Sequence, residues 1–313
     1  MNKKISWPHT LKTGDTIGVF SPSEPLWDGR LEQVLLGCRR LEKYGYSVIL
    51  SSNVDKEQWD SAGSIDDRLT DFNELLTNKG VQAIGSSWGG KAANQLVGSL
   101  NYDKIIQEKK PIFGFSDVAV LLNNITLRTG LITYFGPNVV GKLHETDHDD
   151  LHLLCDPNHG EGSNPFIARS LTKEWRAIQT QGSYEGTLFG GNLSTFVLGV
   201  ELDLLKQHRG NIILFWESSS ETPQIIKQYL NCLLLNGALN SVSCMIVGDV
   251  RWTDDGYEHQ PMEDFLSDFA SRAGIGLIMC PTFGHAKLTN PIIPVGATFH
   301  VESSPTNSRI IIG

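Results

Sequence analysis

Thr16-Ile17-Gly18-Val19-Phe20-Ser21-Pro22-Ser23 is a short apolar run that stops at turn-forming residues, as a buried parallel strand does. The segment 30–44 follows it and carries apolar side chains every three to four positions, which predicts an amphipathic helix. Further strands are expected at 47–50, 81–86 and 111–115, and further helices at 65–76, 91–100 and 118–128. This alternation predicts an α/β domain with a mostly parallel, Rossmann-like sheet and right-handed crossovers.

The periodic pattern breaks between about residues 141 and 182, where polar runs such as 144–150 and 156–162 interrupt it. Beyond that break, strands are expected at 186–198, 211–216, 242–247, 276–279 and 298–301, and one helix at 223–235. We therefore predict an N-terminal α/β domain over residues 1–160, a linker over 161–182, and a C-terminal, strand-rich α+β domain over 183–313.

Composition and charge argue against a nucleic-acid-binding, membrane or secreted protein. The 313 residues include 26 Lys and Arg against 35 Asp and Glu, a formal net charge of -9, and no basic run, so a nucleic-acid polymer is a poor candidate partner. No apolar stretch approaches the ~18 residues of a membrane helix, and Trp7-Pro8-His9 interrupts the N-terminal segment before a signal sequence develops. The five cysteines are odd in number and widely spaced, which is typical of buried thiols in a reducing compartment. We expect a cytoplasmic protein that does not enter a membrane.

A candidate nucleophile stands in Pro111-Ile112-Phe113-Gly114-Phe115-Ser116-Asp117-Val118-Ala119. An apolar strand delivers Ser116 into a turn from which a helix starts, and the N–H of Asp117 is then suited to bind an oxyanion. Val118 replaces the second glycine of the G-x-S-x-G form. The alternative is that Ser116 or Asp117 only caps the helix that follows.

A serine nucleophile needs a base, and the base needs a group that orients it. His285 follows the apolar run 275–279 and lies on a loop just past a strand, whereas the other histidines lie in polar or terminal sequence. Glu217 ends the strongly apolar segment 212–216. The alternatives are a loop histidine without a role and an acid that caps the following helix.

Taken together, six motifs resemble, in order, those of the LD-carboxypeptidase family of serine peptidases, which includes the microcin C self-immunity peptidases. The resemblance spans roughly residues 14–296. The motifs are Ser86-Ser87-Trp88-Gly89-Gly90, Gly114-Phe115-Ser116-Asp117, Tyr134-Phe135-Gly136-Pro137, Gly190-Gly191-Asn192-Leu193, Trp216-Glu217 and Phe283-Gly284-His285.

The resemblance implies a Ser-Glu-His triad in a cleft between the two domains. Ser116 is then the nucleophile, His285 the general base and acid, and Glu217 the group that fixes the imidazole. The N–H of Asp117 and an N–H of the Gly89-Gly90 turn would form the oxyanion hole. The resemblance further implies acyl-enzyme chemistry without a metal or cofactor, and a homodimer.

The residues around the Gly89-Gly90 turn bear on which class of substrate the resemblance implies. The family's murein tetrapeptide carboxypeptidases usually carry Arg-Gly-Gly-Tyr-Gly there, whereas this chain has Trp88-Gly89-Gly90-Lys91. That form looks more like the immunity branch, which implies a peptidyl or aminoacyl nucleotide as substrate. Trp88, Trp175 and Asn192 are the residues expected to contact it, although local packing is the alternative for Trp175. A murein tetrapeptide is the alternative substrate.

Three other interpretations of the sequence are less favoured. Gly89-Gly90-Lys91 lacks the G-x-x-x-x-G-K-[ST] spacing of a phosphate-binding loop. His144, His148 and His152, spaced by four, would share one face of a helix and form a conceivable metal site, but such runs are usually solvated. An alternative from a different class is a non-catalytic two-domain protein that closes on a small ligand.

Overall fold

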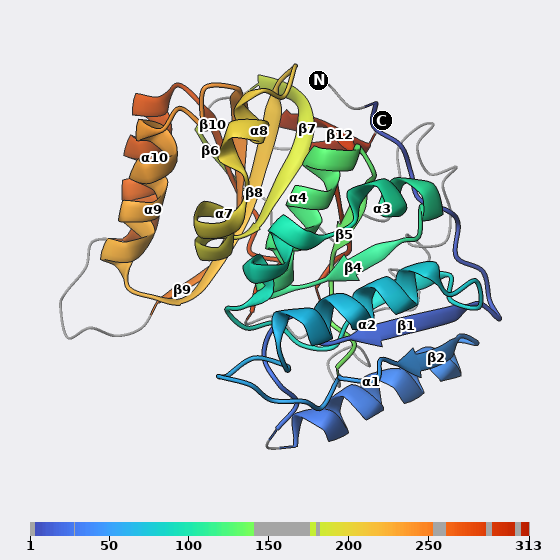
Figure 1. The fold of residues 1–313 in the computed structure, drawn as a ribbon. Helices are drawn as coiled ribbons and strands as arrows, with labels where there is room; N and C mark the ends of the chain where they lie inside the picture. The colour runs from blue at the N-terminus through green and yellow to red at the C-terminus, as the bar shows by residue number, and fades with distance from the viewer. Residues whose placement is uncertain are drawn as a thin grey trace. The chain divides into compact units, whose positions relative to one another are not determined.

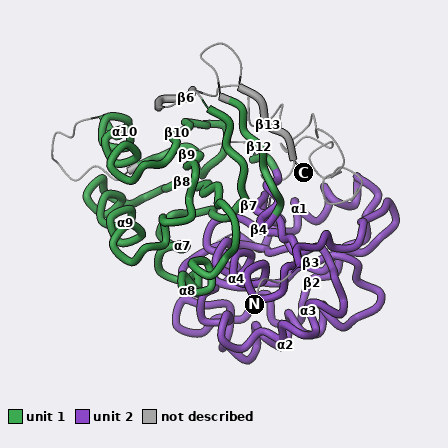
Figure 2. Tube along the Cα trace, turned by 90° about the horizontal axis from the view of Figure 1, so that it is seen from above, with its two compact units in different colours: residues 1–2, 159–291, 297–313 green, residues 3–158, 292–296 purple. Residues whose placement is uncertain are grey.

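A computed structural model describes residues 4–27, 29–140, 176–179, 182–252, 261–285, 290–303 and 308–312. The chain forms two compact units (Figure 2). The N-terminal unit comprises residues 3–158 and 292–296, and the C-terminal unit comprises 1–2, 159–291 and 297–313. Each unit has its own sheet, so the predicted two-domain α/β architecture is confirmed. Most of the expected linker, 161–182, lies outside the described residues.

The N-terminal unit contains a six-stranded sheet in the order β11-β5-β4-β3-β1-β2. Strands β1 to β5 run parallel, and β11, which comes from far along the chain, pairs antiparallel with β5. The strands are β1 Thr16–Phe20, β2 Ser47–Leu50, β3 Ala83–Ser86, β4 Ile112–Gly114, β5 Thr133–Phe135 and β11 Ile293–Val295. The helices are α1 Arg30–Lys43, α2 Ile65–Thr77, α3 Tyr102–Glu108 and α4 Ala119–Thr129, with the short 3-10 helices η1 Ala93–Ser99 and η2 Ser116–Val118.

Helix α1 lies on one side of this sheet, and α2 and α3 lie on the other (Figures 1 and 2). Gly18 lets α2 approach closely, because a Cβ there would lie 2.7 Å from Cδ2 of Leu75. Since the central strands are parallel, the turns that follow β1, β3 and β4 emerge at one edge of the sheet. Residues 21–23, 87–90 and 115–117 therefore share that edge.

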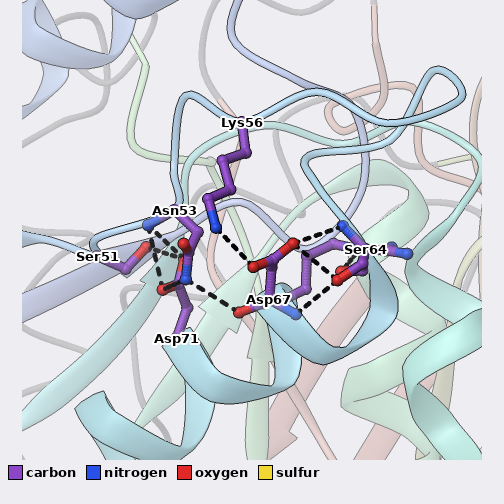
Figure 3. Close-up of polar contacts among 7 residues, drawn as sticks. Ser51, Asn53, Lys56, Ser64, Asp67 and Asp71 are labelled. Carbon is purple, nitrogen blue, oxygen red and sulfur yellow. Dashed lines mark hydrogen bonds and ion pairs between the residues drawn. The ribbon is translucent and has the colours of Figure 1, made fainter.

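The loop between β2 and α2 is fixed at both of its ends (Figure 3). The carboxylate of Asp71 accepts hydrogen bonds from Ser51 Oγ at 2.7 Å and from Asn53 Nδ2 at 2.7 Å. Ser64 caps α2 in a reciprocal capping box with Asp67. Hydrogen bonds from Lys56 and Ser64 lower the pKa of Asp67 to about 2. Two carboxylates on one helix thus hold the loop in place.

The C-terminal unit contains a seven-stranded sheet in the order β13-β12-β7-β8-β9-β10-β6. Strands β7 to β10 run parallel, whereas β12, β13 and β6 pair antiparallel. The strands are β6 Arg176–Gln179, β7 Gly182–Asn192, β8 Ile212–Glu221, β9 Val242–Trp252, β10 Gly276–Met279, β12 Thr298–Ser303 and β13 Ser308–Ile312. The helices are α7 Leu193–Gly199, α8 Leu202–Lys206, α9 Pro223–Leu235 and α10 Met262–Ala273. The expectation of a strand-rich second domain is confirmed.

Two expected elements were wrong. The strand expected at 186–198 ends at Asn192, because the Asn192 side chain accepts a hydrogen bond from the N–H of Thr195 and starts α7. The helix expected at 91–100 is only the 3-10 helix η1, since Gly98 weakens it and Asn101 caps a new helix, α3. Helices α8 and α10 were not expected from the sequence.

The described residues bear on two expectations from composition, one about membrane helices and one about the burial of the cysteines. No helix in the described ranges is long and apolar enough to cross a membrane. Cys38, Cys244 and Cys280 are buried thiols, but Cys232 is exposed, contrary to the expectation, because it lies on the outer face of α9. Cys155 lies outside the described residues.

Candidate active site

Ser116 sits on a sharp turn between strand and helix. Strand β4 ends at Gly114, Phe115 is extended, and Ser116 begins η2, which runs into α4. The backbone φ of Ser116 is +63°, a left-handed conformation that costs a non-glycine residue ~1–3 kcal/mol. Its side chain is partly exposed, whereas Phe115 and Asp117 on either side are buried. This is the backbone of a nucleophile elbow.

The side chain of Asn138 fixes the turn before Ser116 through two hydrogen bonds. Its Oδ1 accepts hydrogen bonds from the N–H of Phe115 at 2.8 Å and from Ser86 Oγ at 2.5 Å. The side chain is buried and ties the turn after β4 to the end of β3. Sequence reasoning missed Asn138, although it directly follows the Tyr134-Phe135-Gly136-Pro137 motif.

The Gly89-Gly90 turn lies against Ser116. A Cβ on Gly89 would lie 2.9 Å from Ser116 Cβ and 3.2 Å from Ser116 Oγ, closer than side chains normally pack, so glycine favours this approach. Among the described residues, the N–H groups of Gly89, Gly90 and Asp117 have no hydrogen-bond acceptor. Unpaired backbone donors beside a serine hydroxyl are what an oxyanion hole requires.

Trp88, an expected substrate contact, is half-buried and packs against a charged neighbour. The Arg30 guanidinium lies 4.9 Å from the centroid of the Trp88 ring, within the range of a cation–π contact. Arg30 also pairs with Glu24 at 2.6 Å. The N–H of Glu24 donates to the carbonyl of Gly89 at 3.1 Å, so this group borders the glycine turn.

Glu217 and His285, both in the C-terminal unit, form a short hydrogen bond. His285 Nδ1 lies 2.7 Å from Glu217 Oε2, and the Glu217 side chain is fully buried. Because a carboxylate only accepts hydrogen bonds, Nδ1 donates and Nε2 becomes the nitrogen that can take up a proton. The His285 side chain is 30% exposed, as a base that must reach substrate requires.

The loop after β10 that carries His285 is anchored to the sheet. The carbonyl of Phe283 accepts from the N–H of Asp249 at 2.7 Å, and the N–H of Gly284 donates to Asn290 Oδ1 at 2.7 Å. Gly284 has φ +138°, a conformation that favours glycine. The Phe283 ring contacts Phe215 edge-on, two residues before Glu217. Packing and backbone bonds together fix the imidazole beside the carboxylate.

Asn192 completes the pair. It lies opposite Glu217 in the parallel register of β7 and β8, and its Nδ2 donates to Glu217 Oε1 at 3.1 Å. Its Oδ1 accepts from Ser194 Oγ at 2.8 Å and from the N–H of Thr195 at 3.3 Å, which fixes the orientation of the amide. We therefore propose that Asn192, expected to contact substrate, positions Glu217.

Replacing Asn192 with aspartate is expected to lower kcat at neutral pH about 10- to 100-fold, the size of a coupling between contacting groups. A second carboxylate facing Glu217 would favour protonation of one of the two and disturb the contact with His285. The helix cap is retained, because aspartate caps helices as well as asparagine does. Steady-state kinetics with Asn101→Asp as the control, an equivalent cap on α3, tests this. Equal activity of the two variants would contradict the positioning role.

The described residues thus place two groups of expected site residues, one in each unit. Ser116, Asp117, Gly89, Gly90 and Trp88 gather in the N-terminal unit, and Glu217, His285 and Asn192 gather in the C-terminal unit. Trp175 lies outside the described residues, as do His144, His148 and His152. In the part of the chain that is described, no group of three or more His, Cys, Asp or Glu side chains is arranged to hold a metal ion.

Comparison with known proteins gives matches over most of the chain. The model of the LD-carboxypeptidase N-terminal domain matches residues 17–136, and that of the LD-carboxypeptidase C-terminal domain matches residues 185–301. The Microcin C7 self-immunity protein MccF of Escherichia coli is 29% identical over 278 residues, 81% of each chain. The Probable murein peptide carboxypeptidase of Bacillus subtilis (strain 168) is 28% identical and covers 98% of this chain and 94% of its own.

The solved structure of MccF in complex with glutamyl sulfamoyl guanosine superimposes with a TM-score of 0.82. It is 24% identical, and the match covers 98% of each chain. At this identity the likeness establishes that the fold is shared.

Proposed function

The chain belongs to the LD-carboxypeptidase family, and from this premise we propose that it is a serine peptidase or amidase with a Ser116-His285-Glu217 triad. The observation that carries the proposal is the hydrogen bond between His285 Nδ1 and the fully buried Glu217. A buried carboxylate that fixes the tautomer of a partly exposed histidine is the base and orienter of a serine hydrolase. The strained backbone at Ser116 supports its role as nucleophile.

The proposal requires the two groups of residues to act on one substrate. Ser116 Oγ and His285 Nε2 must come within hydrogen-bond reach, about 2.6–3.2 Å, in the complex with substrate. We propose that the substrate carbonyl binds between them. That the two domains together form one active site is therefore part of the proposal.

In the first step, Nε2 of His285 takes the proton of Ser116 as Oγ attacks the carbonyl carbon. The tetrahedral oxyanion accepts hydrogen bonds from the N–H of Asp117 and from the Gly89-Gly90 turn. Glu217 stabilises the imidazolium, which then protonates the leaving nitrogen as the bond breaks. Water attacks the acyl-enzyme in the same way and releases Ser116.

We propose a small aminoacyl or peptidyl nucleotide as the substrate. The support is the 29% identity with a microcin self-immunity protein and the shared fold of MccF, whose structure holds glutamyl sulfamoyl guanosine. A murein tetrapeptide is the second candidate. It is favoured by the murein peptide carboxypeptidase of Bacillus subtilis, which matches 98% of this chain.

Side-by-side assays separate the two candidates. Purified protein is incubated with aspartyl sulfamoyl adenosine and, separately, with a murein tetrapeptide, and free aspartate or alanine is quantified by mass spectrometry. We expect kcat/KM to be at least ~100-fold higher for the nucleotide, a difference of about 2.7 kcal/mol in transition-state binding. Hydrolysis of the tetrapeptide alone would favour the second candidate. Binding of either compound without hydrolysis would contradict the peptidase proposal and favour a binding protein.

A further inference from the structure

The side chain of Asp117, next to the proposed nucleophile in sequence, carries a buried carboxylate, and the proposed reaction uses only the backbone of this residue. The residue is 3% exposed. Its Oδ2 accepts hydrogen bonds from Ser23 Oγ at 2.6 Å and from the N–H of Ala93 at 2.8 Å. Burial raises the pKa of this carboxyl group. Such a group is unfavourable in the interior unless its hydrogen bonds are satisfied, so its partners matter.

Arg68 of α2 contacts the same two backbone segments as Asp117, residues 22–23 and 92–93. It is 1% exposed, and its Nη1 donates to the carbonyls of Pro22 at 2.9 Å and Ala92 at 3.0 Å. Burial lowers the pKa of Arg68, and the negative charge of Asp117 opposes that shift. The arginine thus binds the carbonyls, and the aspartate binds the hydroxyl and N–H donors, of segments 22–23 and 92–93.

Ser23 connects this network to the glycine turn. Its Oγ donates to Asp117 and accepts from the N–H of Ala92 at 2.8 Å. A Cβ on Gly90 would lie 2.5 Å from the same oxygen. The segment from Gly89 to Ala93 is therefore held by Ser23 and Asp117 at one end, and its Gly89 lies against Ser116 at the other.

We propose that Asp117 and Arg68 clamp the segment that carries Gly89 and Gly90, and so set the distance between the second oxyanion donor and Ser116. Asp117 then has two separate roles: its N–H binds the oxyanion, and its carboxylate is a positioning group that acts through Ser23 and Ala93. The inference rests on the proposed function, because it assumes that this turn stabilises a transition state.

The test compares Asp117→Ala and Asp117→Asn in the full-length protein. Asp117→Ala removes the acceptor of both hydrogen bonds, and we expect kcat per titrated active site to fall about 100-fold, as when one oxyanion donor is lost, with KM within about threefold of wild type. Asp117→Asn places an amide oxygen where Oδ2 accepts both bonds. It should retain at least about one tenth of kcat, since the loss of charge toward Arg68 is then the main change.

A transition-state analogue provides the readout that a merely structural role would not change. The inhibition constant of a peptide boronate should rise in Asp117→Ala by the same factor by which kcat/KM falls, whereas substrate binding changes little. Asp71→Ala is the matched control. Asp71 is also buried, at 2% exposure, and accepts from Ser51 and Asn53, but it holds the loop after β2 (Figure 3). We expect it to lower stability while kcat per folded molecule stays within about threefold.

Each outcome decides the proposal. If Asp117→Ala and Asp71→Ala both keep wild-type kcat per active site, the clamp has no positioning role. If Asp117→Ala does not fold, Ser23→Ala removes the middle link instead, and an unchanged kcat there overturns the proposal. Hydrolysis that persists in Ser116→Ala would show that the proposed function itself is wrong. Loss of hydrolysis in Ser116→Ala, together with full activity in both Asp117→Ala and Ser23→Ala, would reject the clamp alone.

Discussion

Replacing Ser116 with alanine is expected to lower kcat/KM about 10⁴- to 10⁶-fold, or roughly 5 to 8 kcal/mol of transition-state stabilisation. The substitution removes the oxygen that forms the acyl-enzyme and leaves the oxyanion donors in place. Alanine tolerates the left-handed backbone at this position about as poorly as serine does, so the fold and its stability should change little. Progress curves with the better of the two substrates, and urea unfolding, measure the two quantities.

Ser52→Ala is the matched control for that result. Ser52 is an exposed serine in the turn after β2, in the same unit as Ser116, and its removal should leave kcat/KM unchanged. Turnover of Ser116→Ala within about tenfold of wild type would remove Ser116 from the mechanism. A metal-activated or acid–base route would then have to be sought.

Replacing Glu217 with glutamine is expected to lower kcat about 10³- to 10⁴-fold, comparable to the loss of the orienting carboxylate in other triads. The expected loss follows from the two hydrogen bonds that Glu217 makes in this chain. Asn192 Nδ2 donates to Oε1, so the glutamine must place its carbonyl toward Asn192 and its NH₂ toward His285. Nδ1 would then have to accept a hydrogen bond, so the single ring proton would lie on Nε2. A protonated Nε2 cannot accept the proton of Ser116.

A double variant tests this explanation. In Asn192→Asp combined with Glu217→Gln, the new carboxylate accepts from the glutamine NH₂, and the glutamine carbonyl faces His285 again. We expect kcat to recover about tenfold over Glu217→Gln alone, a coupling of roughly 1.4 kcal/mol. Glu185→Gln, which alters the exposed Glu185–His300 pair in the same unit, should not change kcat. A double variant no better than the single one would contradict the tautomer argument.

The sequence predicts the parts of the fold that rest on local patterns. Short apolar runs that end in turn formers identified β1 to β4, and the strand-turn-helix pattern around Ser116 located the elbow. The boundary at Asn192 failed because apolar residues continue to Leu198, and an asparagine cap interrupts such a run without changing its hydrophobicity. Strand β11 was missed because three residues, 293–295, join a sheet whose other strands lie more than 150 positions earlier.

Local sequence patterns likewise identify only part of the candidate site. Ser116 and His285 stand just after predicted strands, and Glu217 ends the apolar segment 212–216, although β8 continues to Glu221. The structure brings Glu217 and His285 together across 68 positions. The residues that hold the site were harder to find. Arg68 reaches Ala92, and Asn138 reaches Phe115, through contacts that no local spacing indicates. Parallel strands bring such residues to one edge of a sheet only once the strand order is known.

The most direct test of the proposed triad is a crystal structure of the protein after reaction with a fluorophosphonate. We predict phosphorus bonded to Ser116 Oγ and a phosphonyl oxygen that accepts from the N–H of Asp117 and from the Gly89-Gly90 turn. His285 Nε2 should lie about 3 Å from an oxygen of the adduct. An unmodified Ser116, or an adduct with His285 and Glu217 out of reach, would contradict the account.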